Sequence, residues 1–269
     1  MNSTNKDFEG ELPQIWEAFV TRFFDKPKYI PCLELTLQER GYHQPLPILD
    51  VSGGFGFPAL DLLERGYPVV YNDGSPAMFS YFDYLRKQKN LGMFGMPELF
   101  PTSWKEMVKA HPPKFYGALL CRGNSLPYVV SWGKENPNLS QAQNEIATIL
   151  RGFRRLLVKG GVFFVDKHRD IDVEKSEKEE MEDLGEYIDR FSGIQYELTS
   201  KLVNDPTTRK RLWTIDRTNK QTQEVEQFHS QAYYFTDDEL VNMLETAGFH
   251  DIKQHQLAGD YYHSFTALS

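Results

Sequence analysis

The amino-acid sequence predicts an α/β fold with a mainly parallel sheet, helices on both faces and an antiparallel β insertion. Within residues 48–71, a short apolar run, a glycine-rich turn, a helical pattern and a second apolar run follow one another. A second helix-then-strand unit occupies residues 139–165. Over residues 193–235 the apolar period shifts toward two, which is typical of antiparallel strands.

The first half of the chain contains two helices before the sheet and three further elements after the opening unit. Residues 11–24 carry an apolar helical stripe, and residues 29–42 predict a second helix. A helix is predicted from Pro76 to about Asn90, because a turn precedes it and proline suits the first helical position. Residues 91–103 break regular structure, and 115–121 predict a central buried strand that ends in a polar loop.

The second half alternates between charged and β-rich segments. A helix at 139–158 ends at a double glycine, and 162–165 predict the next strand. Residues 171–190 alternate Glu and Lys, so they predict a solvated helix or a partly mobile loop. The remaining predictions are strand-rich pieces at 194–203, 209–217 and 223–235, a helix with a capping box at 236–239, and strands at 250–257 and 261–268.

Composition restricts the class of protein. The chain has 269 residues, which suits one elaborated domain, and its formal charge of −8 disfavours nucleic acid as a partner. Cys32 and Cys121 lie in apolar surroundings, so we expect no disulfide framework. The N-terminus lacks the apolar core of a signal peptide, and no apolar run would span a bilayer. We therefore expect a cytoplasmic protein without membrane partners.

The glycine-rich turn predicts a nucleoside site. Gly53, Gly54 and Gly56 follow the first strand, where bare backbone can approach a ligand. Asp73 lies 23 residues after Asp50, a separation that accommodates one helix and a return strand. This places a carboxylate where it can accept both ribose hydroxyls, so the segment predicts an adenosine-containing ligand.

The helix start distinguishes two kinds of adenosine ligand. Phe57 and Pro58 stand where a dinucleotide site would present bare backbone to a pyrophosphate. S-adenosylmethionine has no phosphate and tolerates a bulkier turn, so the deviation favours this methyl donor. A nicotinamide-dependent oxidoreductase is a weaker alternative.

Two sequence motifs resemble those of class I S-adenosylmethionine-dependent methyltransferases, and more narrowly the glycine N-methyltransferase and glycine/sarcosine N-methyltransferase group. Residues 49–56 resemble the family pattern L-D-V-x-C-G-T-G, with Gly53 and Phe55 as departures. Residues 64–78 resemble E-x-G-F followed by D-A-S-x-x-M, which makes Asp73 the ribose ligand. The resemblance implies a Rossmann-like, seven-stranded methyltransferase sheet.

Three later segments extend the resemblance toward the substrate. Ser103-Trp104 resembles the Asn-Trp pair of the family's adenine pocket, although Trp104 is equally suited to the core. Residues 122–126 are similar to L-G-N-S-F, which borders the methionine part of the cofactor; Arg122 and Tyr128 depart from the family there. Residues 156–170 resemble R-A-G-G-L-L-V-I-D-H-R-N with one extra residue, and this match implies that Arg169 holds a substrate carboxylate.

The resemblance also implies a division of the chain and a set of site residues. We expect one methyltransferase domain over 1–269, with an N-terminal helical cap (1–45), a cofactor-binding core (46–170), a substrate-side insertion (171–235) and a C-terminal helix and strands of the core (236–269). The expected cofactor-binding residues are Asp50, Ser52, Gly54, Gly56, Asp73, Gly74, Ser75, Met78, Ser103, Trp104, Arg122, Gly123, Asn124 and Ser125.

The expected catalytic residues are Asn124, Arg169, His168 and Tyr128. Asn124 would orient cofactor and substrate, and Arg169 would favour an acidic acceptor such as an amino acid. His168 would serve as a base only for a hydroxyl or carbon acceptor. For each, a structural role is the alternative. Tyr128, Tyr233 and Tyr234 are candidates for lining the acceptor pocket, and core packing is their alternative.

The expected activity is methyl transfer from S-adenosylmethionine, with S-adenosylhomocysteine as product, to a nitrogen of a small amine or amino acid. An oxygen, carbon or sulfur acceptor is the alternative within this class, and a catalytically silent cofactor-binding regulatory protein is the alternative outside it. His229, His255 and His263 lack metal-ligand spacing, so no metal is expected. Whether the chain forms a homo-oligomer stays open.

Overall fold

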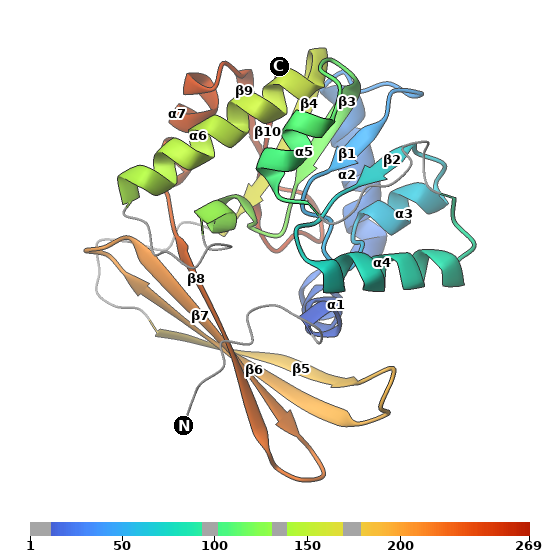
Figure 1. Cartoon of the computed structure of the whole chain (residues 1–269), viewed down its shortest axis with the longest axis vertical. Helices are drawn as coiled ribbons and strands as arrows, with labels where there is room; N and C mark the ends of the chain where they lie inside the picture. Colours follow the sequence, from blue (N-terminus) through green and yellow to red (C-terminus); the bar gives the residue numbers. More distant parts are fainter. Residues whose placement is uncertain (1–11, 93–101, 131–138, 169–178) are drawn as a thin grey trace.

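The computed structural model describes residues 12–92, 102–130, 139–168 and 179–269 (Figure 1). A six-stranded sheet has the order β2-β1-β3-β4-β10-β9, and a four-stranded sheet has the order β5-β6-β7-β8. The strands are β1 (Ile48–Asp50), β2 (Val69–Tyr71), β3 (Tyr116–Cys121), β4 (Leu157–Lys167), β5 (Glu179–Ile188), β6 (Gln195–Asp205), β7 (Lys210–Asn219), β8 (Val225–Tyr233), β9 (His250–His255) and β10 (His263–Leu268). The helices are α1 (Leu12–Phe23), α2 (Lys26–Glu39), α3 (Ala59–Glu64), α4 (Pro76–Gln88), α5 (Trp104–Ala110), α6 (Leu139–Leu156) and α7 (Asp237–Thr246), with a short 3₁₀ helix η1 (Leu126–Val130).

The larger sheet is covered by helices on both faces, as predicted. Strands β2, β1, β3 and β4 are parallel, and β10 and β9 continue the sheet in antiparallel pairing. Successive side chains of a strand point to opposite faces. On β1, Ile48 therefore packs in the cluster that contains residues of α2, α3 and α4, whereas Leu49 packs in the cluster that contains residues of α5, α6 and α7. The α/β prediction is confirmed.

The four-stranded sheet is antiparallel throughout and confirms the predicted β insertion. It lies below the larger sheet in Figure 1, with α1 between them. Helix α1 packs against both β5 and α4. The ring of Trp16 in α1 lies 5.1 Å from the ring of Trp213 in β7, measured between centroids. The N-terminal helix therefore contacts both the insertion and the core.

The prediction of a helix or loop over residues 171–190 is wrong for its described part. Residues from Glu179 form strand β5, which pairs with β6 along its whole length. β5 is an edge strand, and charged side chains are tolerated there because one side of the strand faces no partner. Leu184 of β5 is buried. The alternating Glu and Lys residues in this segment therefore indicate a partly exposed strand at the end of the four-stranded sheet, and not a helix.

The expected seventh strand of the larger sheet is not found: the described residues form six strands, and β2 ends the sheet. Residues 89–103 connect α4 to α5. Residues 93–101 of this connection lie outside the described part of the chain.

Candidate functional site

The site begins at the glycine-rich turn after β1. Gly54 and Gly56 have positive φ values of 54° and 117°, a conformation that suits glycine. Gly53 is required for another reason: a Cβ on this residue would lie 2.2 Å from a ring carbon of Tyr71. The Tyr71 hydroxyl donates a hydrogen bond to the Gly54 carbonyl oxygen. The departure of Gly53 from the family pattern thus accompanies a tyrosine that fills the same space.

Asp73 lies beside this turn, at the end of β2. Its Oδ2 accepts a hydrogen bond of 2.9 Å from the Gly54 backbone N–H, and its Oδ1 accepts one of 2.8 Å from the Ser75 N–H. The carboxylate is largely buried, and desolvation raises its pKa to about 6. Each carboxylate oxygen can accept a further hydrogen bond. Asp73 can therefore bind ligand hydroxyls while it orders the turn.

Asp50 has an oxygen without a partner. It is fully buried at the end of β1, its Oδ1 accepts from the Ser52 backbone N–H at 3.3 Å, and burial raises its pKa to about 7. Its Oδ2 has no hydrogen-bond partner among the described residues. Buried polar atoms are normally hydrogen-bonded, so this oxygen fits the donor of a bound ligand. Two carboxylates thus border the same turn.

The ends of β3 and β4 adjoin the end of β1. Ser52 Oγ lies 3.0 Å from the Arg122 carbonyl oxygen, to which it donates. The Asn124 backbone N–H donates to Asp166 Oδ1 at 2.7 Å, and Asn124 Oδ1 accepts from the His168 N–H at 3.2 Å. Asn124 is buried and has a φ of 54°. These bonds fix its side chain between the two strand ends.

The side chain of Arg122 is part of a buried ionic cluster. Its Nη2 lies 2.9 Å from Asp166 Oδ2, and its guanidinium carbon lies 4.4 Å from the ring centroid of Tyr29. Burial raises the pKa of Asp166 to about 6, although the Arg122 charge opposes this shift. Arg122 was expected to bind the cofactor. Its guanidinium is held in the core by these contacts, and the main chain of Arg122 and Gly123 follows the end of β3.

Several expected cofactor residues hold the local backbone. Ser75 caps α4 by accepting from the Met78 N–H at 3.3 Å, with Gly74 before it. Ser103 caps α5 in a capping box with Glu106. Trp104 Nε1 donates to the Val51 carbonyl oxygen at 2.6 Å, so its indole is fixed beside the end of β1.

The bulky residues of the turn, Phe55 and Phe57, are buried. The Phe57 ring lies 5.3 Å from the ring of Phe24 and 5.4 Å from the ring of Tyr29, between centroids. Lys26 lies over both turn rings. The aromatic character of the turn therefore serves contacts with the N-terminal helices.

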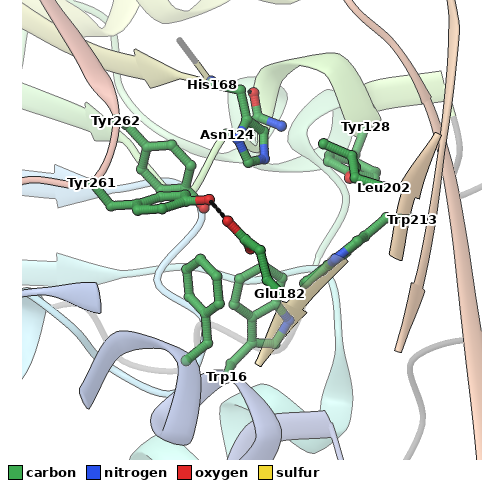
Figure 2. Close-up of a pocket in the computed structure, with 11 residues that line it drawn as sticks. Trp16, Asn124, Tyr128, His168, Glu182, Leu202, Trp213, Tyr261 and Tyr262 are labelled. Carbon is green, nitrogen blue, oxygen red and sulfur yellow. Dashed lines mark hydrogen bonds between the residues drawn. The ribbon is translucent and has the colours of Figure 1, made fainter. Parts of the chain in front are cut away.

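A pocket opens next to Asn124, and we call it the acceptor pocket (Figure 2). It lies between α1, the antiparallel sheet, the ends of β3 and β4, and the segment before β10. Its lining residues are Trp16, Phe19, Gly123, Asn124, Tyr128, His168, Glu182, Leu202, Trp213, Tyr261 and Tyr262. The insertion and the core thus build one pocket.

Three expected catalytic residues, Asn124, Tyr128 and His168, meet in this pocket. Arg169 lies outside the described residues. Tyr233 and Tyr234 are buried and do not line the pocket; the Tyr234 ring lies 4.9 Å from the Arg209 guanidinium.

The imidazole of His168 contacts two tyrosine rings edge-on, with centroid distances of 5.9 Å to Tyr261 and 5.1 Å to Tyr262. Burial lowers the pKa of His168 well below its usual value, and the charges of Arg211 and Lys167 lower it further. The ring is therefore neutral at physiological pH and is a weak base.

Seven pocket residues were not predicted as site residues: Trp16, Phe19, Glu182, Leu202, Trp213, Tyr261 and Tyr262. They come from segments far apart in the sequence, and none belongs to a motif. For the aromatic residues among them, the one signal in the sequence was an aromatic side chain within a largely polar segment, and core packing explains such a residue equally well. Glu182 was concealed within a run of charged residues.

The three histidines considered for a metal site are dispersed. His229 is near Thr214, His255 Nε2 lies 2.7 Å from Thr266 Oγ1, and His263 Nδ1 lies 3.0 Å from Asp237 Oδ2. Across the described ranges, no group of three His, Cys, Asp or Glu side chains is arranged to hold a metal ion. None of the described helices has the length and apolar character needed to cross a membrane.

Comparisons with known proteins give distant relatives only. No family model matches the chain. The chain is 24% identical to glycine N-methyltransferase of Mus musculus over 167 residues, which are 61% of this chain and 53% of that enzyme. The chain therefore matches about half the length of this relative. It is 22% identical to glycine/sarcosine N-methyltransferase of Aphanothece halophytica over 231 residues, 85% of this chain and 74% of that enzyme.

Among solved structures, a sugar N-methyltransferase from a Streptoalloteichus species superposes with a TM-score of 0.67 at 16% identity, over 100% of this chain and 96% of that one. Identity this low shows a shared fold. The two sequence matches point to the same class of proteins, and so do the glycine turn and Asp73 at the strand ends. Together these findings support a class I S-adenosylmethionine-dependent methyltransferase.

Proposed function

We propose that the protein transfers a methyl group from S-adenosylmethionine to a nitrogen of a small amine or amino acid. The observation that carries this proposal is the position of Asn124. This residue lies between the ends of β3 and β4, beside the expected cofactor-binding residues, and also lines the acceptor pocket. A cofactor bound at the glycine turn would therefore approach the acceptor pocket at Asn124.

The residues around the turn fit S-adenosylmethionine. Asp73 would accept the ribose hydroxyls, because its oxygens keep acceptor capacity beside Gly54. The unpartnered Oδ2 of Asp50 would accept from a donor of the methionine part. Trp104 would border the adenine with its fixed indole. The bound cofactor supplies an electrophilic methyl carbon on a positively charged sulfur.

The pocket side chains favour nitrogen as the acceptor atom. An amine attacks through its own lone pair and needs no strong base, whereas a hydroxyl or an acidic carbon needs one. His168 is held neutral and weakly basic, so it is poorly suited to the second task. What the chain contributes is therefore mainly positioning and exclusion of water.

Calorimetry with S-adenosylmethionine tests the proposal. We expect Asp73→Asn to weaken cofactor binding at least about tenfold, because it removes the charged acceptor at the turn. Asp216→Asn, on β7 of the insertion, is the matched control and should bind like the wild type. Methyl transfer from radiolabelled cofactor to a panel of amines and amino acids then measures the activity.

Absence of cofactor binding at millimolar concentration would contradict the proposal. Preference for NADH over S-adenosylhomocysteine would instead support a nicotinamide-dependent oxidoreductase. Tight binding without transfer to any acceptor would support a regulatory cofactor-binding protein, and transfer only to hydroxyl, carbon or sulfur acceptors would place the activity elsewhere in the class.

A further inference from the structure

The acceptor pocket contains one acidic side chain among its described lining residues, Glu182 of β5. Its Oε1 accepts a hydrogen bond of 2.7 Å from the Tyr261 hydroxyl. Figure 2 shows this bond bridging the pocket, with Asn124 and His168 above it and Trp16 below. Tyr261 therefore holds the carboxylate at the pocket instead of leaving it free to turn into solvent.

Aromatic rings line the same pocket as this carboxylate. Trp16 and Trp213 lie 5.1 Å apart between centroids and line the pocket with Tyr261. Aromatic faces attract cations, and the attraction grows when the cation is shielded from water. A carboxylate among such rings is a typical environment for an organic ammonium ion.

The described residues that line the pocket include no positively charged side chain that could bind an anion. No Lys or Arg is among the described lining residues. Arg211 interacts with His168 and Tyr128, but it is buried and its Nε donates to Asn204 Oδ1 at 2.8 Å. Lys167 Nζ lies 2.5 Å from Asp237 Oδ1. The described pocket thus favours a positive ligand over a carboxylate.

We propose that Glu182 is the residue that selects the acceptor, and that the acceptor is a compact amine with an apolar or cyclic body that needs no carboxylate of its own. This inference rests on the proposed function. It departs from the role that the sequence suggested for Arg169, which would favour an amino acid.

The charge balance of the reaction gives Glu182 a second effect. The acceptor arrives as an ammonium ion and releases one proton to solvent water. The nitrogen lone pair then forms the bond to the methyl carbon, the carbon–sulfur pair stays on sulfur, and the nitrogen becomes positive again. A carboxylate near that nitrogen stabilises the charge as it develops. Glu182 therefore favours binding of the ammonium form, opposes loss of its proton, and stabilises the positive charge that returns to nitrogen during methyl transfer.

Three ring probes of similar shape test the selection: cyclohexylamine, cyclohexanol and cyclohexanecarboxylate. Their binding to the full chain saturated with S-adenosylhomocysteine is measured by ligand-observed NMR. We expect the wild type to bind the amine about tenfold more tightly than the alcohol, and to bind the carboxylate least. Glu182→Gln should lose the preference for the amine, because it keeps the shape of the side chain and removes the charge.

Glu186→Gln is the matched control: Glu186 lies on the same strand, is exposed and pairs with Lys220. It should behave like the wild type. Tyr261→Phe keeps the ring and removes the donor to Glu182, so it should reduce the preference partially. Thermal melts of each variant report whether it is folded.

The inference is overturned if Glu182→Gln keeps the wild-type preference, or if the wild type prefers the alcohol or the carboxylate. Binding of S-adenosylhomocysteine is recorded in the same samples. Its absence would refute the proposed function, whereas normal cofactor binding with an unaltered probe preference would refute only the role of Glu182.

Discussion

At the residue scale, the buried carboxylates at the strand ends have a definite chemical consequence. Asp50 and Asp73 lie at the carboxyl ends of β1 and β2. Burial raises their pKa values to about 7 and about 6, respectively. A buried carboxylate with a raised pKa binds a proton more readily in the folded chain than in the unfolded chain. Below these pKa values each group is neutral and is a weaker partner for cationic donors.

Cofactor affinity should therefore depend on pH. Because a positively charged ligand prefers the ionised carboxylates, the affinity for S-adenosylmethionine should be greatest near pH 8 and fall through pH 7 and 6, by up to about tenfold per unit once Asp73 is protonated. Calorimetry between pH 5.5 and 8 measures this. Asp73→Asn should retain only the dependence contributed by Asp50, and equal affinities at both limits would contradict the assignment.

Sequence patterns predict a cofactor side of the site because the residues assigned to it are close in the chain or adjoin strand ends. Asp73 and Asn124 were predicted from their positions after apolar runs. In the structure both follow the carboxyl ends of parallel strands of the larger sheet, Asp73 after β2 and Asn124 after β3. Glu182 and Trp213 could not be predicted, because only the pairing of β5, β6 and β7 and the packing of α1 bring them to the pocket.

At the scale of elements, capping interactions place several site residues. The Ser103 side chain caps α5, and the next residue, Trp104, reaches the Val51 carbonyl oxygen at the end of β1. Loss of the cap at the N-terminus of α5 would therefore also make the position of the Trp104 indole less well defined. The cap therefore links a local backbone feature to the shape of the cofactor cleft.

Replacing Ser103 by Ala should lower the free energy of unfolding by about 1 kcal/mol, because the Glu106 N–H loses its partner. Urea denaturation monitored by circular dichroism measures the change. Ser103→Thr, which keeps a capping hydroxyl, is the control and should remain close to the wild type. If Ser103→Thr lowered the free energy of unfolding as much as Ser103→Ala does, the loss of the capping hydroxyl would not be the cause of the change.

Helices with clear periods and caps were predicted well, such as α6 and α7. Strand β5 was missed because a run of Glu and Lys is compatible with a solvated helix as well as with an exposed edge strand. Periodicity reports which face is solvated, and the identity of the partner strand is not encoded locally. The count of seven strands in the larger sheet was implied by the family resemblance, and the described residues of this chain form six.

At the scale of the whole molecule, the acceptor pocket is formed by parts that the chain connects only at a distance. Trp16 of α1 packs on Trp213 of β7, so the N-terminal helix braces the antiparallel sheet over the strand ends (Figures 1 and 2). The residues proposed to bind the cofactor at the glycine turn and Asp73 lie at the ends of β1 and β2 in the larger sheet. The two halves of the site should therefore respond separately to substitution.

We expect Trp16→Ala to raise the acceptor KM at least about tenfold, because it removes a large aromatic wall, and to leave cofactor affinity within about twofold. Steady-state kinetics with an amine identified in the acceptor panel, together with calorimetry, separate the two effects. Trp16→Phe should recover most of the loss. A parallel decline of cofactor affinity would show that α1 supports the cleft as well.

The contact of Gly53 with the Tyr71 ring constrains how this chain can evolve. Position 53 lies at the glycine turn and position 71 on the neighbouring strand, yet the two share a single volume. A larger residue at 53 is admissible only after the ring at 71 has been exchanged for a smaller side chain. A substitution at 53 alone would displace the Tyr71 ring, so exchange of the two positions is expected to be coupled.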